Sequence, residues 1–225
     1  AVDQLPVGID LAVILTPAET VPGLMDACGR HGIQRAVIES GGFGEYSPAG
    51  RRLEQELIEV ARRWSMRFVG PNCISAVNME AGLCLPFLLL RPESIKRGPV
   101  SVLAQSGGVS ITYLTLMSEL GPGINKVVSM GNKTDLDERD YLQFLLEDPG
   151  TEIICLYLES IEEGRRLIEM ARSASKPVII QKANVTQQSS QVAYSHTAAL
   201  ANDDQIVDAA LRQAGIPRAA SFGDA

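Results

Sequence analysis

The stretch VSVLAQSGGVSITYLTLMSEL, residues 100–120, contains a strand, a turn and a helix in direct succession. Residues 100–104 form a short apolar run rich in β-branched side chains, typical of a buried strand. A turn with two glycines follows, and residues 109–120 are long enough for a helix. A strand that enters a helix through a glycine turn is the repeating unit of a parallel sheet covered by helices.

The same alternation continues on both sides of this stretch. Before it, the sequence predicts strands at residues 10–16, 35–39 and 67–69, and helices at residues 21–31 and 51–64. After it, the sequence predicts strands at residues 126–130, 152–158 and 177–182, and helices at residues 136–147, 162–173 and 203–214. Apolar strands that alternate with helices predict an α/β fold with two consecutive parallel-sheet units.

Residues 91–99, RPESIKRGP, form a polar stretch with proline and glycine between two such series. Stretches of this composition are typical of domain boundaries. We therefore expect one domain at residues 1–92 and a second at residues 93–225. A dinucleotide-type half opens with a strand, a glycine-rich turn and a helix. The chain begins instead with a polar lead-in, so we expect the first βα unit to lie outside this sequence.

The composition bears on several classes of partner. The chain has 225 residues with 20 basic and 27 acidic side chains, a net charge of −7, and no basic cluster of the kind that nucleic-acid binding requires. No apolar run approaches the roughly 20 residues of a membrane-spanning helix, and the N-terminus does not resemble a signal peptide. We expect a cytoplasmic protein without nucleic-acid or membrane partners. The four cysteines form no C-x-x-C pair, so no metal site is expected.

The turn Gln105–Gly108 is the first candidate site. Glycines at a strand-to-helix turn let backbone N–H groups approach an anion, and the helix dipole adds to the attraction. Ser106 offers a hydroxyl as well. The alternative is a glycine turn that serves only tight packing.

A second candidate is His196, in the segment YSHTAAL at residues 194–200, just before the last predicted helix. The chain has two histidines, so imidazole chemistry must use His31 or His196. Neutral imidazole accepts a phosphoryl group readily. The alternative is an exposed loop histidine without a catalytic role.

Two further strand ends carry polar side chains. Glu159 lies at the end of the strand ICLYLES, where its carboxylate can fix the tautomer of an imidazole. The alternative is a solvated carboxylate without a catalytic role. The turn GNKTD, residues 131–135, places Asn132 and Lys133 where they can contact phosphate. The alternative here is an ordinary turn with a helix N-cap at Thr134 or Asp135.

Five segments in this order carry a resemblance to a known family. They are GPNC at residues 70–73, AQSGG at 104–108, SMGNKTDLD at 129–137, LYLES at 156–160 and SHTAALAND at 195–203. Together they resemble the NDP-forming acyl-CoA synthetases, relatives of the succinyl-CoA synthetase α subunit. The resemblance implies a truncated Rossmann-like CoA-binding domain at residues 1–92 and a flavodoxin-like CoA-ligase domain at residues 93–225.

The resemblance also implies a mechanism. Acyl-CoA and phosphate would exchange for an acyl phosphate and CoA, and the acyl phosphate would phosphorylate His196. The phosphohistidine loop would then move to an ATP-grasp unit, where Mg²⁺ and ADP or GDP receive the phosphate. Glu159 would orient His196. The implied phosphate-binding residues are Ser106, Gly107, Gly108, Asn132 and Lys133. The implied CoA-binding residues are Thr16, Pro17, Ser40, Gly41, Gly42, Asn72 and Cys73.

The implied partners are an ATP-grasp subunit or domain, a small carboxylic acid and further copies of the chain. Three departures from the family pattern limit the transfer. Ala198 stands where glycine is common and Asn202 where small residues are common. The expected front unit, which would carry a CoA-phosphate loop, is absent from this sequence, and so is an ATP-grasp segment. The chain alone is therefore not expected to complete a ligase cycle.

Two other functions remain open from the sequence. Some bacterial protein lysine acetyltransferases carry a similar region that binds acyl-CoA without turnover, and such regions commonly lose the histidine that is retained here at position 196. A scaffold role in subunit assembly is the other. The sequence specifies neither the acyl group nor the nucleotide.

Overall fold

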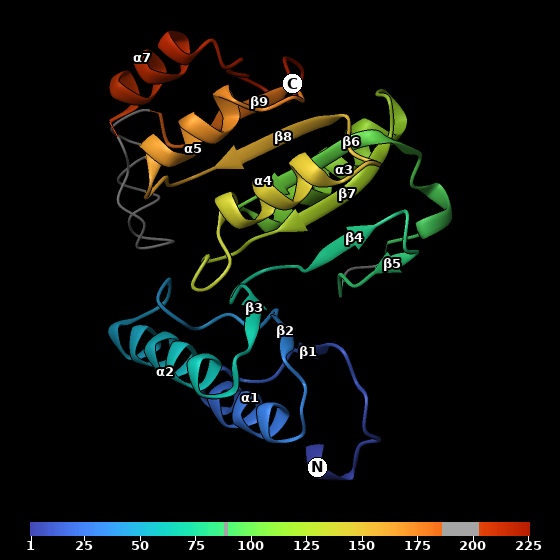
Figure 1. The fold of residues 1–225 in the computed structure, drawn as a ribbon, viewed down its shortest axis with the longest axis vertical. Helices are drawn as coiled ribbons and strands as arrows, with labels where there is room; N and C mark the ends of the chain where they lie inside the picture. The colour runs from blue at the N-terminus through green and yellow to red at the C-terminus, as the bar shows by residue number, and fades with distance from the viewer. Residues whose placement is uncertain (88–89, 186–202) are drawn as a thin grey trace.

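The computed structural model describes residues 1–87, 90–185 and 203–225 and contains two β-sheets. The first sheet has three parallel strands in the order β1 (Ala12–Ile14), β2 (Arg35–Ile38) and β3 (Arg67–Val69). It forms the lower part of the molecule together with α1 (Val21–Arg30) and α2 (Pro48–Trp64), which lie side by side (Figure 1).

Close packing joins these two helices. A Cβ added to Gly29 would lie 2.2 Å from the ring of Trp64, so the glycine is what allows the indole to pack on α1. The indole Nε1 donates to Asp26 at 2.9 Å. Apolar side chains that α1, α2 and the sheet bury form one core cluster, including Met25, Leu57 and Phe68.

The second sheet has six strands in the order β5-β4-β7-β6-β8-β9. Their bounds are β4 (Ala76–Asn78), β5 (Leu83–Cys84), β6 (Arg97–Ala104), β7 (Ile124–Ser129), β8 (Ile153–Leu158) and β9 (Val178–Lys182). The four strands β6 to β9 are mutually parallel, whereas β4 pairs antiparallel with both β5 and β7. The sheet is therefore mixed.

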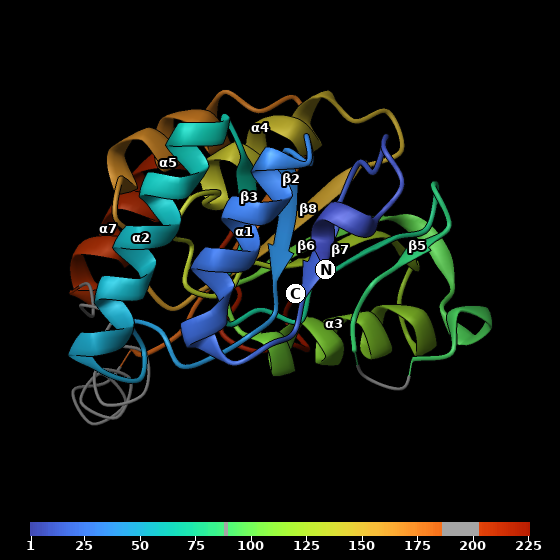
Figure 2. The same ribbon diagram turned by 90° about the horizontal axis from the view of Figure 1, so that it is seen from below.

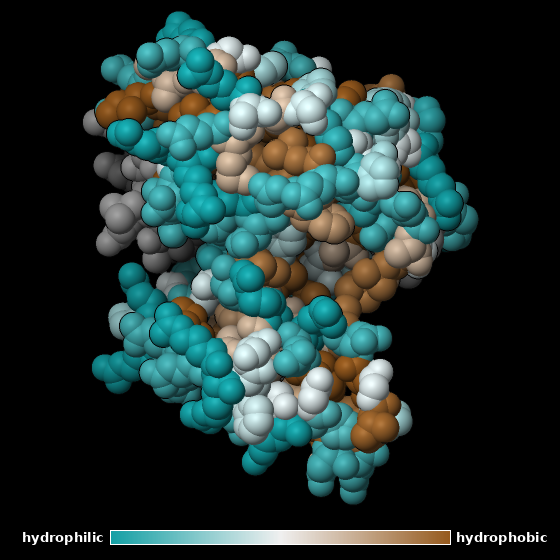
Figure 3. Space-filling view, in the orientation of Figure 1, coloured by the Kyte–Doolittle hydropathy of each residue, from teal (hydrophilic) through white to brown (hydrophobic). Residues whose placement is uncertain are grey.

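Helices cover both faces of this second sheet (Figure 2). One face carries α3 (Gly107–Glu119). The other carries α4 (Glu138–Glu147) and α5 (Gly164–Arg172), and α7 (Asp204–Ala214) packs on α5. Short 3₁₀ turns occur at η1 (Val2–Gln4), η2 (Ala18–Thr20) and η3 (Pro92–Ser94). Hydrophilic residues cover most of the face in Figure 3, and hydrophobic ones gather where the two parts of the molecule meet.

The predicted α/β class and the order of the predicted elements are confirmed. The place of β4 and β5 in the second sheet was not predicted. Strands β4 and β5 lie within the expected first domain, residues 1–92, yet hydrogen-bond to the second sheet. The boundary at residue 92 stays a prediction, but the division between the sheets falls between β3 and β4.

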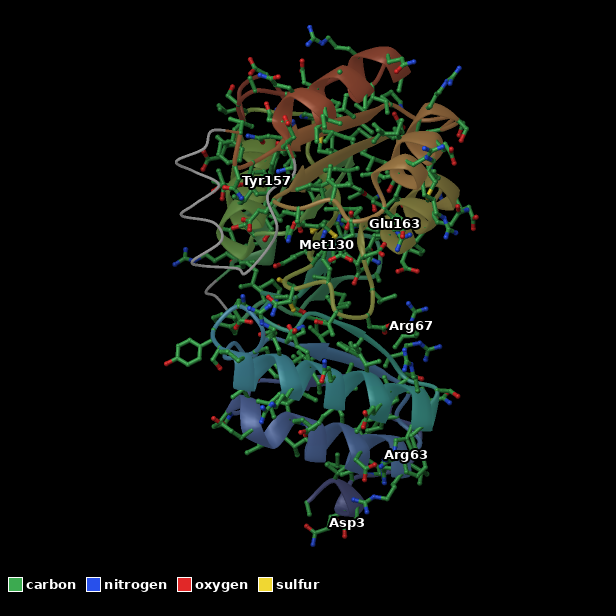
Figure 4. All side chains as sticks on the ribbon, turned by 90° about the vertical axis from the view of Figure 1, so that its left-hand side faces the viewer. Asp3, Arg63, Arg67, Met130, Tyr157 and Glu163 are labelled. Carbon is green, nitrogen blue, oxygen red and sulfur yellow. The ribbon has the colours of Figure 1, made fainter. Side chains whose placement is uncertain are left out.

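The beginning of α4 corrects another expectation. Its N-cap is Asp137, whose side chain accepts from the backbone N–H of Arg139, and not Thr134 or Asp135. The carboxylate of Asp135 instead accepts from Arg67 Nε at 3.0 Å and from the backbone N–H of Phe68 at 2.7 Å. Arg67, labelled in Figure 4, lies at the level where the two sheets approach each other. Among the described residues, no helix combines the length and the apolar character needed to span a bilayer.

Candidate functional site

The strand order of the second sheet creates a switch point between β6 and β8. The chain leaves β6 for β7 on one side and returns to β8 on the other. In open parallel sheets, ligands bind outside the carboxyl ends of the strands at such a point. Gln105 follows β6 there and Glu159 follows β8, so two of the five motifs meet at this edge.

Gln105 joins these two strand ends. Its Oε1 accepts from the backbone N–H groups of Glu159 at 2.9 Å and Ser160 at 3.0 Å, and its Nε2 donates to Ser160 Oγ at 3.1 Å. A buried amide that satisfies three groups holds the backbone of the loop after β8 in one conformation. Sequence reasoning gave Gln105 no role of its own because its partners lie more than fifty positions away along the chain.

The N-terminus of α3 presents an anion-binding geometry. Ser106 is the N-cap and makes no side-chain capping hydrogen bond, and the first turn contains no acidic residue. The first N–H groups of a helix have no intrahelical partner. Gly107 lies close to Ile74, since an added Cβ would be 2.9 Å from its Cγ2, whereas no atom of the described residues lies within 4 Å of a Cβ at Gly108. The turn is therefore approachable on the Gly108 side.

Asn132 and Lys133 have different surroundings. The Nδ2 of Asn132 donates to Glu45 at 2.6 Å and to Glu54 at 2.8 Å, so it links the loop after β7 to the loop after β2 and to α2. Lys133 has a left-handed backbone with φ of 57°, and its side chain is only 3% exposed. Its Nζ donates to Glu138 at 2.8 Å and to the carbonyl of Ser160 at 2.9 Å. Lys133 therefore connects the loop after β7 to the loop after β8 through the carbonyl of Ser160.

The predicted CoA-binding residues gather at the carboxyl edge of the first sheet. Ser40 Oγ donates to the carbonyl of Ile14, and the N–H of Asn72 donates to the carbonyl of Ser40 at 3.0 Å. Added Cβ atoms at Gly41 and Gly42 would meet Asn72 and Ala18 at 3.3 Å. The three strand-end loops of this sheet are thus in mutual contact.

A cleft of about 750 Å³ lies where the carboxyl edges of the two sheets meet. The predicted site residues that line it are Asn72, Cys73, Ser106, Gly107, Asn132 and Glu159. The predicted residues that do not line it are Thr16, Pro17, Ser40, Gly41, Gly42, Gly108 and Lys133. His196 lies outside the described residues. The structure therefore brings the expected phosphate turn and the expected orienting carboxylate into one cleft.

Burial changes the protonation behaviour of two groups in this cleft. Burial raises the pKa of Glu159, while the charges of Lys182 and Lys133 act against that rise. Burial also raises the pKa of Cys73 to about 12. Its Sγ lies 3.3 Å from the carbonyl of Ile38, to which the thiol donates. Cys73 therefore stays a neutral thiol at physiological pH.

Sequence reasoning missed Glu39, which also lines the cleft. The signal was present, because Glu39 is a carboxylate placed directly after an apolar strand.

Two family models together match most of the chain. One, described as a CoA binding domain, matches residues 1–79, and the other, described as a succinyl-CoA ligase like flavodoxin domain, matches residues 97–225. The chain is 40% identical to acetate–CoA ligase [ADP-forming] I of Archaeoglobus fulgidus, over 97% of this chain and 32% of the relative. It is 38% identical to the α subunit of acetate–CoA ligase [ADP-forming] I of Pyrococcus furiosus, over 99% of this chain and 48% of the relative.

A solved structure agrees with these matches. The chain superposes with a TM-score of 0.90 and 37% identity on the dinucleotide-forming acetyl-coenzyme A synthetase 1 of Ca. Korarchaeum cryptofilum, in complex with phosphate and ADP. The match covers 99% of this chain and 48% of the other. The chain thus spans about half the length, or less, of these relatives.

Proposed function

The chain belongs to the NDP-forming acyl-CoA synthetase family, and we propose that it is the CoA-ligase portion of such an enzyme. The reaction interconverts acyl-CoA, phosphate and NDP with carboxylic acid, CoA and NTP, through an acyl phosphate and a phosphohistidine at His196. The observation that carries this proposal is the cleft in which the uncapped N-terminus of α3 and the carboxylate of Glu159 lie together.

The cleft provides what an acyl phosphate reaction needs. Backbone N–H groups at Ser106 and Gly107, which line the cleft, and at Gly108 next to them in the first turn of α3, stabilise the phosphate dianion without a basic side chain. Glu159 holds a negative charge at the edge of the same space, where it accepts a hydrogen bond from an imidazole N–H and raises the basicity of the other ring nitrogen. Asn72 and Cys73, on a strand-end loop of the first sheet that lines the same cleft, would hold the thiol end of CoA near these groups.

The remaining parts of the reaction belong to a partner. An ATP-grasp subunit or domain would bind the nucleotide and Mg²⁺ and receive the phosphoryl group from His196. The present chain would use CoA as its cofactor and a small carboxylic acid as its substrate. We further propose that it assembles into an oligomer in the cytoplasm.

We expect His196→Ala to abolish phosphorylation of the chain. The full-length protein with its ATP-grasp unit is incubated with γ-labelled NTP and Mg²⁺, and acid-labile, base-stable phosphate is counted. His31→Ala is the matched control, because His31 is the chain's other histidine and its Nε2 lies 3.0 Å from the carbonyl of Pro6, in the first domain. Equal labelling of the His196→Ala protein and its parent would refute the phosphohistidine. Binding of acyl-CoA by a parent protein that never becomes labelled would favour the sensing role instead.

We expect Gly108→Asp to weaken phosphate use without loss of stability. The new carboxylate has open space around its Cβ and lies in the first turn of α3, where a negative charge stabilises a helix by about 0.3–1 kcal/mol. The same charge repels a phosphate at that turn. The KM for phosphate in the acyl-CoA-consuming direction should rise at least about tenfold, while the melting temperature stays equal or rises. An unchanged KM for phosphate would show that the N-terminus of α3 does not bind the phosphate.

A further inference from the structure

Glu39 is a buried carboxylate at the wall of the cleft. It follows β2 directly, is 6% exposed and lines the cleft. Neither of its carboxylate oxygens has a hydrogen-bond partner among the described residues. Burial raises its pKa, and the hydroxyl of Ser75, which lies nearby but makes no hydrogen bond of good geometry, acts in the opposite direction.

Other carboxylates of the same cleft are paired. Glu45 accepts from the backbone N–H groups of Gly42 and Phe43 and from Asn132, and Glu54 accepts from Asn132 and Thr134. Removing a carboxylate from water without hydrogen bonds costs free energy, so folding alone does not account for a glutamate at position 39. A group retained at such a cost is a candidate for chemistry.

The thiol of Cys73, next to Glu39, does not act as a proton acceptor in the cleft. Cys73 lies close enough for the charge of Glu39 to raise its pKa further, and burial is the larger cause of the rise. Its S–H is already donated to the carbonyl of Ile38. Cys73 therefore remains a neutral thiol at the wall of the cleft, and among the described residues no donor makes a hydrogen bond of good geometry to Glu39.

We propose that Glu39 is the general base that takes the proton from the thiol of CoA when its sulfur attacks the acyl phosphate. The inference deepens the proposed function and rests on it. The sulfur forms a bond to the acyl carbon while the bond from that carbon to the phosphate oxygen breaks, with its electron pair going to the phosphate. The thiol proton passes to the Glu39 carboxylate and then, through water, to the released phosphate, so the products are a thioester and hydrogen phosphate. In the reverse direction, protonated Glu39 returns the proton to the departing thiolate.

The environment of Glu39 suits this transfer. A thiol has an ordinary pKa near 8.5, well above that of an exposed glutamate. Burial raises the pKa of Glu39 and so narrows the difference between the pKa values of the carboxylate and the thiol. A general base is more efficient when its pKa is closer to that of the acid it deprotonates. A carboxylate that accepts no hydrogen bond of good geometry keeps more of its basicity than one whose charge is stabilised by donors.

The test separates acyl phosphate formation from thioester formation. Full-length protein with its ATP-grasp unit receives NTP, Mg²⁺ and acetate, and two products are measured in parallel. Hydroxylamine traps acetyl phosphate as the hydroxamate when CoA is omitted, and CoA gives acetyl-CoA when hydroxylamine is omitted. For Glu39→Gln we expect acetyl-CoA formation to fall about 100-fold or more in kcat, with hydroxamate formation and the KM for CoA within a factor of about three of the parent.

A matched control is Glu56→Gln, an exposed glutamate on α2 that should leave both products unchanged. Three results would overturn the inference: equal losses of both products in Glu39→Gln, no loss of either, or a rise in the KM for CoA with kcat unchanged. The last would make Glu39 a binding group. A parent protein that forms no hydroxamate from acetate or from any other small carboxylic acid would instead refute the proposed function itself.

Discussion

Replacing Glu159 by glutamine is expected to slow phosphoryl transfer through His196 by about 100-fold or more. The amide keeps the shape of the side chain but loses the charge that orients an imidazole and stabilises its protonated form. The N–H of Glu159 is held by Gln105, so the backbone of the variant should not move. Single-turnover labelling from γ-labelled NTP on a rapid-quench time scale measures the rate.

Glu163→Gln is the control for this change. Glu163 lies four positions further along, is 62% exposed and pairs only loosely with Arg139 at 3.7 Å. Figure 4 labels it. A rate for Glu159→Gln that equals the rate for Glu163→Gln would show that Glu159 has no part in the transfer.

The second large effect concerns stability. Lys133→Met should lower the free energy of unfolding by about 3–5 kcal/mol, because it leaves the buried carboxylate of Glu138 without its cation. Both side chains of this pair are 3% exposed and their charged atoms lie 2.8 Å apart. Chemical denaturation followed by circular dichroism measures the difference.

The double variant Lys133→Met/Glu138→Leu tests the cause. When both charges are absent, no buried charge is left unpaired, and most of the lost stability should return. The exposed pair of Arg212 and Asp208 gives the comparison, since Arg212→Met should cost less than about 1 kcal/mol. Equal losses for Lys133→Met and the double variant would mean that the loss comes from the carbonyl of Ser160, which also accepts from Lys133 Nζ.

The alternation of elements was readable from the sequence. β6 ends directly before the QSGG motif as expected, α3 begins inside the motif at Gly107, two residues before the predicted start, and β3 begins and ends at the predicted residues. These features depend on near neighbours in the chain, namely apolar periodicity, β-branched composition and glycine at a turn. The five motifs also placed Ser106 and Glu159 at strand ends, and parallel strands bring such ends to one edge.

The short strands β4 and β5 were not readable in this way. Val77 pairs with Val127 in the neighbouring strand, and a run of three residues carries too little periodic signal to be recognised alone. Their antiparallel addition makes the second sheet mixed and moves the division between the sheets ahead of residue 76.

The sequence by itself determined the fold class, the family and the chemistry offered at each strand end, because those properties are written in local patterns. Only the tertiary structure decided which of those groups share a cleft. Asn132 reaches Glu45 across 87 positions and Glu54 across 78, and Lys133 turns inward to Glu138. In the described part of the chain, the same packing leaves both carboxylate oxygens of Glu39 without a hydrogen bond. Burial and pairing are set by residues distant in the chain, and burial and pairing are what govern the pKa and the reactivity of a carboxylate.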